Sequence, residues 1–227
     1  MELFKHSLYI NLKHRTDRNE RVQEELSKMN IVCERVEAIR HEKGNIGCTY
    51  SHIKCLTIAK ERKYPYVFIC EDDIQFTNTE LLKKNMEKFE NMHNSGFKWD
   101  VLIIGGNTCP PFEQINDFCV RTYNVQTTTG YIVQQHYYDI LLDNYKDGVY
   151  NLLKEPAKKN VYSIDIYWKR LQKDHWYITI PLSVCQYSDY SDIEKRVTDY
   201  SRAMLDLEKK GFFQKPENIG NIKMNYL

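Results

Sequence analysis

The chain has 227 residues, of which 42% are hydrophobic and 28% are charged, and its formal net charge at pH 7 is +1. This composition is typical of a globular protein with a real core, and it excludes a disordered chain. The balanced charge argues against a nucleic-acid binder, which would carry a basic surplus. No apolar stretch approaches the ~20 residues that a transmembrane segment needs.

Seven cysteines are scattered along the chain without a Cys-x-x-Cys pair. Their number is odd, and some, such as Cys70, lie in apolar runs, where a thiol behaves as a small hydrophobic group. The N-terminal run MELFKHSLYINL is too interrupted by polar residues for a signal peptide. We therefore expect free thiols, a reducing cytoplasmic setting and no zinc ribbon.

Strand and helix patterns alternate along the chain. The expected elements of the first half are a strand at 7–12, a helix at about 17–29, a strand at 31–36, a glycine-containing turn at 44–47, a helix at about 50–62 and a buried strand at 66–70. The pattern Asp17-x-x-Glu20 predicts a capping box at the first helix.

The second half continues the alternation. Its expected elements are a helix at 79–92, a strand at 100–104 broken by Gly105-Gly106, a loop at 108–117, strands at 118–125 and 130–133, helices at 136–145 and 164–171, and a strand at 176–180. We expect one domain over 1–208 and an irregular tail over 209–227. The tail mixes lysines with Phe212 and Phe213, which is compatible with peripheral membrane contact, but it lacks an amphipathic period, so a packed or frayed terminus is favoured.

This order of elements predicts an α/β fold with a mainly parallel central sheet. In such sheets, ligands bind outside the carboxyl ends of the strands. Asn11, the triplet Glu71-Asp72-Asp73 and Gly105 each follow a predicted strand. We therefore expect a ligand site at these residues.

The acidic triplet needs a compensating charge, because three adjacent carboxylates repel one another. In an extended chain Glu71 and Asp73 face one way and Asp72 the other. Converging carboxylates suit Mg²⁺ or Mn²⁺, and such an ion keeps positions open for a diphosphate. The alternatives are a solvated loop and an N-cap for the following helix.

Several segments together resemble glycosyltransferase family 25, which includes lipooligosaccharide and collagen galactosyltransferases. The matching segments are YINLKHRTDRNERVQEEL, GNIGCTYSH, YVFICEDDIQF, TTTGYIV, SIDIYWKRL and VCQYSDYSDIEKR. They follow the family's order from Leu8 to Arg196. The chain departs from the family pattern at Asn45, where Glu is usual, and at Ser163, where Pro is common.

The resemblance implies a GT-A-like, Rossmann-type domain that uses a divalent metal, Mn²⁺ or Mg²⁺, and a UDP-sugar donor, with inversion at the sugar. It implies metal contact mainly by Asp73, assisted by Glu71 or Asp72, with Glu71 or Asp72 otherwise bonding the ribose. The other implied site residues are Asn11, Arg15 and Arg18 for the nucleotide, His52 near the donor or acceptor, and Thr129, Gly130 and Tyr131 for the sugar pocket.

Asp165 is the expected general base, because the apolar residues Ile164 and Ile166 flank it and partial desolvation would make it more basic. The alternative is an N-cap for the helix that begins there. The family's commonest donor sugar is galactose, with glucose and N-acetylglucosamine open, and the acceptor is a hydroxyl of a glycan or glycoconjugate. Competing readings are a metal-dependent phosphotransferase or nuclease and an inactive nucleotide- or glycan-binding protein.

Overall fold

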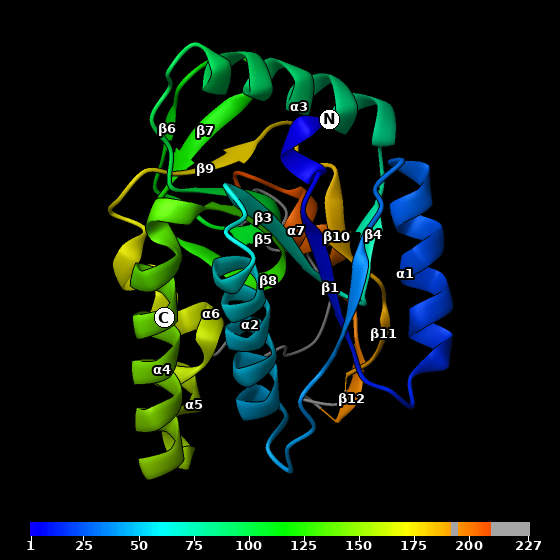
Figure 1. Cartoon of the computed structure of the whole chain (residues 1–227), viewed down its shortest axis with the longest axis vertical. Coiled ribbons are helices and arrows are strands. Elements are labelled where there is room, and N and C mark those ends of the chain that lie inside the picture. Colours follow the sequence, from blue (N-terminus) through cyan, green and yellow to red (C-terminus); the bar gives the residue numbers. More distant parts are fainter. Residues whose placement is uncertain (192–194, 210–227) are drawn as a thin grey trace, which may run out of the picture.

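The computed structural model describes residues 1–191 and 195–209. An eight-stranded sheet in the order β2-β1-β3-β8-β5-β9-β7-β6 forms its centre (Figure 1). The strands of this sheet are β1 (Ser7–Asn11), β2 (Glu34–Glu37), β3 (Tyr66–Glu71), β5 (Val101–Thr108), β6 (Phe112–Gln114), β7 (Cys119–Thr122), β8 (Val125–Gln134) and β9 (Trp176–Thr179). Two small antiparallel ribbons pair β4 (Ile74–Phe76) with β10 (Val184–Gln186), and β11 (Asp189–Ser191) with β12 (Arg196–Thr198).

Helices cover both faces of the central sheet (Figure 1). They are α1 (Thr16–Lys28), α2 (Gly44–Glu61), α3 (Thr79–Asn94), α4 (Tyr138–Lys154), α5 (Lys159–Tyr162), α6 (Ile164–Tyr167) and α7 (Ser201–Leu205). Apolar residues of α1 and α3 pack with Phe68 and Leu102 on one face, and those of α2 and α4 pack with Val67 and Ile103 on the other. Alternate residues of the same strands therefore serve two core layers, as the continuous apolar run at 66–70 predicts.

The α/β class is confirmed, and the central sheet is mixed rather than mainly parallel. β1 is parallel to β2 and β3, and β5 is parallel to β9. β8 is antiparallel to its neighbours β3 and β5, and β7 is antiparallel to β6 and β9. A parallel pair needs a crossover connection, and residues 109–124, between β5 and β8, contain no helix to provide one.

Four local expectations are wrong. Residues 44–47 are the first turn of α2 rather than a preceding turn, and a Cβ on Gly47 would lie 2.5 Å from the carbonyl oxygen of Ile39, so glycine lets the incoming chain pass against the helix. β5 runs through Gly105-Gly106 with irregular register instead of ending there. The expected loop 108–117 contains β6, which pairs with β7.

The fourth error concerns the start of α1. Arg15 precedes the first helical residue, so Asp17 lies inside the first turn and forms an ion pair with Arg15 instead of a capping box. Among the described residues, no helix is both long and apolar enough to cross a membrane. The expectation of an irregular tail falls, beyond Lys209, outside the described residues.

Candidate active site

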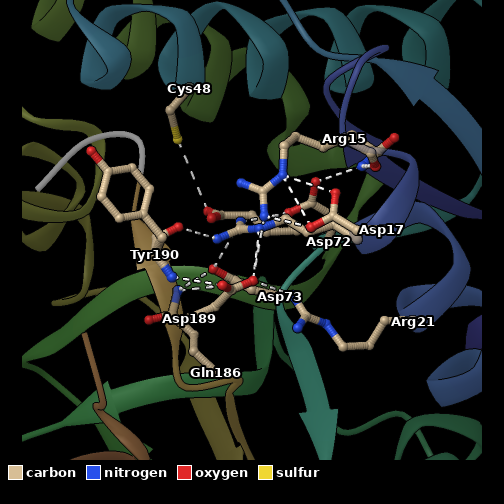
Figure 2. Close-up of polar contacts among 12 residues, drawn as sticks. Arg15, Asp17, Arg21, Cys48, Asp72, Asp73, Gln186, Asp189 and Tyr190 are labelled. Carbon is tan, nitrogen blue, oxygen red and sulfur yellow. Dashed lines mark hydrogen bonds and ion pairs between the residues drawn. The ribbon is translucent and has the colours of Figure 1, made fainter. Parts of the chain in front are cut away.

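The acidic triplet lies where β3 ends and turns into β4. Glu71 is the last residue of β3, and Asp72 and Asp73 form the turn (Figure 2). β3 lies between β1 and β8, so the triplet is flanked by Asn11 at the end of β1 and by Thr128 on β8. Placement at the carboxyl end of a buried strand follows the sequence prediction.

Asp72 is held by protein partners. Asn11, which is buried, donates a 2.6 Å hydrogen bond from Nδ2 to one carboxylate oxygen, and Arg18 donates a 2.9 Å hydrogen bond from Nη1 to the other. Asn11 is itself fixed by Arg35, whose Nη2 lies 2.6 Å from Asn11 Oδ1. Burial raises the pKa of Asp72 above its ordinary value, although Arg18 and Asn11 oppose that rise. Asp72 thus orients Asn11 and Arg18, and both of its oxygens are engaged.

Arg15, which precedes α1, and Arg18 and Arg21 of α1 surround the carboxylate of Asp189 from β11. Asp189 Oδ2 lies 2.6 Å from Arg21 Nη2 and 3.4 Å from both Arg18 Nε and Arg15 Nη2 (Figure 2). Arginine forks match phosphate oxygens as well as carboxylates. A diphosphate that displaced Asp189 would therefore meet several guanidinium groups at the N-terminal end of α1. The sequence analysis missed Arg21 and Asp189, although Arg21 follows Arg18 at helical spacing.

Among the described residues, few positively charged or hydrogen-bonding groups lie close to the carboxylate of Asp73. Gln186 Nε2 lies 3.4 Å from each carboxylate oxygen, and Arg18 Nη1 lies 3.8 Å from Oδ2. Burial, followed by the charges of Glu71 and Asp72, raises the pKa of Asp73 to about 8. A carboxylate with so little positive charge around it has the chemistry of a ligand for a divalent cation.

Glu71 faces helix α2. Its Oε1 atom lies 3.2 Å from His52 Nε2 and 4.0 Å from Cys48 Sγ, and it accepts a hydrogen bond from the Thr128 hydroxyl. Burial raises the pKa of Glu71, but His52 and Thr128 outweigh it and hold the pKa below the ordinary value. His52 is completely buried, and its Nδ1 lies 3.0 Å from the Tyr131 hydroxyl. The structure therefore places His52 as a partner of Glu71.

Asp165 lies in the first turn of α6. Its Oδ2 accepts a 3.2 Å hydrogen bond from the backbone N–H of Thr127, a residue in the left-handed region with φ of 63°. Burial raises the pKa of Asp165, the Thr127 N–H opposes the rise and the charge of Glu71 adds to it. Ser163, and not Asp165, precedes the helix as its cap residue. Asp165 is thus a desolvated carboxyl group within electrostatic range of the triplet.

The remaining candidates lie beneath the site. Thr129 and Tyr131 are completely buried in β8, and Gly130 packs against Phe68 and Ile74. A Cβ on Gly105 would lie 2.8 Å from Val184 Cγ1 of β10. Close packing of β5 against β10 therefore accounts for the glycine at 105, and the β8 side chain that reaches Glu71 is Thr128.

One family model matches part of the chain. A model for "Glycosyltransferase family 25 (LPS biosynthesis protein)" matches residues 41–152, which include His52, the acidic triplet and Thr129–Tyr131. Among solved structures, A197 from STIV is 13% identical, with a TM-score of 0.48 over 97% of this chain and 100% of its own.

Two further solved structures are similar in fold. One is a glycosyltransferase involved in glycosylation of the major capsid of PBCV-1, with 12% identity and a TM-score of 0.43 over 84% of this chain and 95% of its own. The other is a mutant Drosophila β1,4-galactosyltransferase 7 in complex with manganese, UDP-Gal and xylobiose, with 9% identity and a TM-score of 0.45 over 95% of this chain and 82% of its own. The family match carries the assignment: the chain contains a glycosyltransferase family 25 domain at residues 41–152.

Proposed function

We propose that this protein is a metal-dependent, inverting hexosyltransferase that uses a UDP-sugar donor. The family domain supports transfer of a sugar, and galactose is the first donor to test. The acceptor is a hydroxyl group of a glycan or glycoconjugate. The observation that carries the proposal is Asp73, a half-buried carboxylate whose pKa is raised to about 8 and which lies beside Glu71 and 3.8 Å from Arg18 Nη1.

The residues present fit a divalent cation, Mn²⁺ or Mg²⁺. Asp73 would hold it, with Glu71 beside it, because the charge of Glu71 makes ionisation of Asp73 more costly in the absence of a cation. When bound, the ion would stabilise the negative charge of the diphosphate leaving group. Asp72 contributes by fixing Asn11 and Arg18, so that an amide and a guanidinium face the nucleotide.

Three arginines at the start of α1 and just before it would bind the diphosphate. Arg15, Arg18 and Arg21 already gather around one anionic group, the carboxylate of Asp189. Their guanidinium groups stay charged at any working pH and present several donors in a plane. The leaving UDP would exchange with Asp189 for these donors, and cationic groups at the leaving group lower the barrier to its departure.

Asp165 would act as the general base. Inversion requires a group that takes the proton of the acceptor hydroxyl as the bond to the sugar forms. Burial and the nearby charge of Glu71 raise the pKa of Asp165, so its carboxylate accepts a proton more readily than an exposed aspartate does. The N–H of Thr127 fixes the orientation of its carboxylate through Oδ2.

The test is a panel of UDP-sugars assayed for UDP release with and without Mn²⁺ and simple glycan acceptors. The Asp165→Asn variant should lower turnover by about 10²–10⁴-fold, the usual contribution of a positioned base. Calorimetric binding of UDP and Mn²⁺ should survive, because asparagine still accepts the Thr127 N–H. Asp143→Asn, at an exposed position of α4, is the matched control.

Two outcomes would contradict the proposal. Near-normal turnover of Asp165→Asn would remove Asp165 as the base. Binding of UDP with no turnover on any sugar would favour an inactive nucleotide- or glycan-binding protein instead.

A further inference from the structure

One group of three metal-ligating side chains stands out among the described residues. Cys48 Sγ, His52 Nε2 and one oxygen of Glu71 all lie within 4.8 Å of one another. The Glu71 oxygen is 3.2 Å from His52 Nε2 and 4.0 Å from Cys48 Sγ. A tetrahedral ion with bonds of about 2.0–2.3 Å separates its ligand atoms by roughly 3.3–3.5 Å. Small side-chain movements would therefore bring the three atoms to one ion.

The backbone holds these ligands in place. Cys48 and His52 are four residues apart on α2, so they lie one above the other on the face of the helix toward the sheet. Glu71 meets them from the end of β3. Cys48 and Glu71 are only partly buried, whereas His52 is fully buried, so an ion would enter from the side of Cys48 and Glu71.

Outer groups support the ligands in the way that metal sites require. Histidine ligands usually donate their second ring N–H to another group, and the Nδ1 of His52 lies 3.0 Å from the Tyr131 hydroxyl. The Tyr131 hydroxyl lies in turn 3.3 Å from that of Tyr145, so this buried chain of hydroxyls can reverse its direction when Nε2 loses its proton. Thr128 donates a hydrogen bond to the ligating oxygen of Glu71.

We propose that Cys48, His52 and Glu71 form a binding site for Zn²⁺, separate from the hard-metal position at Asp73. A thiolate, an imidazole and a carboxylate are the ligand set that suits zinc, whereas Mn²⁺ and Mg²⁺ prefer oxygen ligands. Three protein ligands leave a fourth position for water. Binding releases the thiol proton of Cys48, together with the Nε2 proton of His52 where it is present, to solvent.

Zinc at this site would oppose the transfer reaction. Glu71 serves both positions, and its Oε1 would turn from hydrogen bonding within the protein to coordination of zinc. Two divalent ions sharing one carboxylate repel each other, so zinc should weaken Mn²⁺ binding at Asp73. The competition, unlike zinc binding itself, rests on the proposed function.

The experiment uses the metal-free full-length protein with Co²⁺ as a spectroscopic probe and Zn²⁺ as the competitor. The wild type should bind one Co²⁺ with a thiolate-to-cobalt charge-transfer band, and Zn²⁺ should abolish that band. Cys48→Ser should lose the band and bind Zn²⁺ at least about 100-fold more weakly, a loss at least as large as that for supporting residues. Cys33→Ser, at another half-buried free cysteine, is the control and should leave both unchanged.

Two further variants keep the test independent of folding and of the proposed reaction. Tyr131→Phe should weaken Zn²⁺ binding about 10-fold while keeping the band, because it removes a supporting group and no ligand. Asp73→Asn should keep the band although it loses Mn²⁺-dependent UDP binding. A band that persists in Cys48→Ser, or a wild type that binds Zn²⁺ no more tightly than Cys48→Ser, would overturn the zinc site. Failure of the UDP assays alone would overturn only the proposed function.

Discussion

At the scale of single residues, the raised pKa of Asp73 predicts how the stability of the protein depends on pH. Its pKa is raised to about 8, so the folded protein keeps a proton there that the unfolded chain has already lost above its ordinary carboxyl pKa. The stability contributed by the protonated form is fully present at acid pH and is lost as the pH rises through 8. Without metal, Asp73→Asn should therefore become more stable relative to wild type between about pH 5 and pH 8. At about 1.4 kcal/mol per pH unit, the expected gain over this window is on the order of 4 kcal/mol.

Thermal unfolding of both proteins across this pH range measures the effect, which corresponds to about 8–16 °C for a chain of this size. Added Mn²⁺ at pH 8 should raise the transition temperature of the wild type and leave that of Asp73→Asn unchanged, because ligand binding stabilises only a folded state that holds the site. If the transition temperatures of the two proteins change in parallel with pH, ionisation of Asp73 does not destabilise the folded protein and the prediction is wrong.

The contacts around Asp73 show which parts of the site could be predicted from the sequence. Alternation along an extended chain predicts that Asp72 faces away from Glu71 and Asp73. Asn11 and Arg18 bind Asp72, but Arg18 Nη1 also lies 3.8 Å from Asp73 Oδ2, so Asp72 and Asp73 share a partner. The local pattern does not predict that Asp189 joins the arginine cluster, because Asp189 lies 168 residues after Arg21 in the chain. Nor does it give the burial of His52, which depends on how α2 packs onto Tyr131.

At the scale of elements, close packing of β5 against β10 makes the second prediction. A Cβ at position 105 would lie 2.8 Å from Val184 Cγ1 and 3.3 Å from Thr129 Cγ2, both on neighbouring strands. Gly105→Ala should therefore destabilise the protein by about 1–3 kcal/mol, the usual cost of overpacking. Val184→Ala in the same chain should recover part of that loss, and a urea-unfolding double-mutant cycle measures the coupling.

β10 also carries Gln186, which contacts Asp73, so Gly105→Ala should weaken Mn²⁺-dependent UDP binding and the double variant should restore it. If the two substitutions are additive in stability, β10 does not press on Gly105. A direct ligand contact would then be the better account of the glycine.

Element positions were predictable where the apolar period was long. The spacing of Leu82, Met86 and Phe89 located α3, and the run 66–70 located β3. The errors lie where tertiary contacts override a local rule. Gly47 lies in the first turn of α2 because the carbonyl of Ile39 leaves no room for a Cβ there, and Gly105-Gly106 continue a strand because β8 and β10 enclose it. β8 runs antiparallel to β3 and β5 because residues 109–124 contain no crossover helix. No local sequence pattern predicts that direction.

At the scale of the whole molecule, one sheet shared by two core layers predicts a single cooperative unfolding transition. Trp99 is buried in the layer beneath α3, and Trp168 and Trp176 are buried in the layer beneath α4, with ring centroids 5.1 Å apart. Strands β3, β5 and β8 contribute residues to both layers, so neither layer can lose its packing without disrupting the sheet. Small single domains unfold in this all-or-none way.

Trp99→Phe keeps Trp168 and Trp176, whose fluorescence reports the layer beneath α4. The double variant Trp168→Phe/Trp176→Phe keeps Trp99, whose fluorescence reports the layer beneath α3. In each variant the urea midpoint by fluorescence should coincide with the midpoint by far-ultraviolet circular dichroism, which reports the whole chain. The double variant should have the lower midpoint, because it gives up two indole hydrogen bonds, from Trp168 to the carbonyl of Val125 and from Trp176 to the Tyr137 hydroxyl. Trp99→Phe gives up one, to His93 Nδ1. Separated midpoints within one variant would mean that the two layers fold as independent units, and the site at the end of β3 would then lie on the boundary between them.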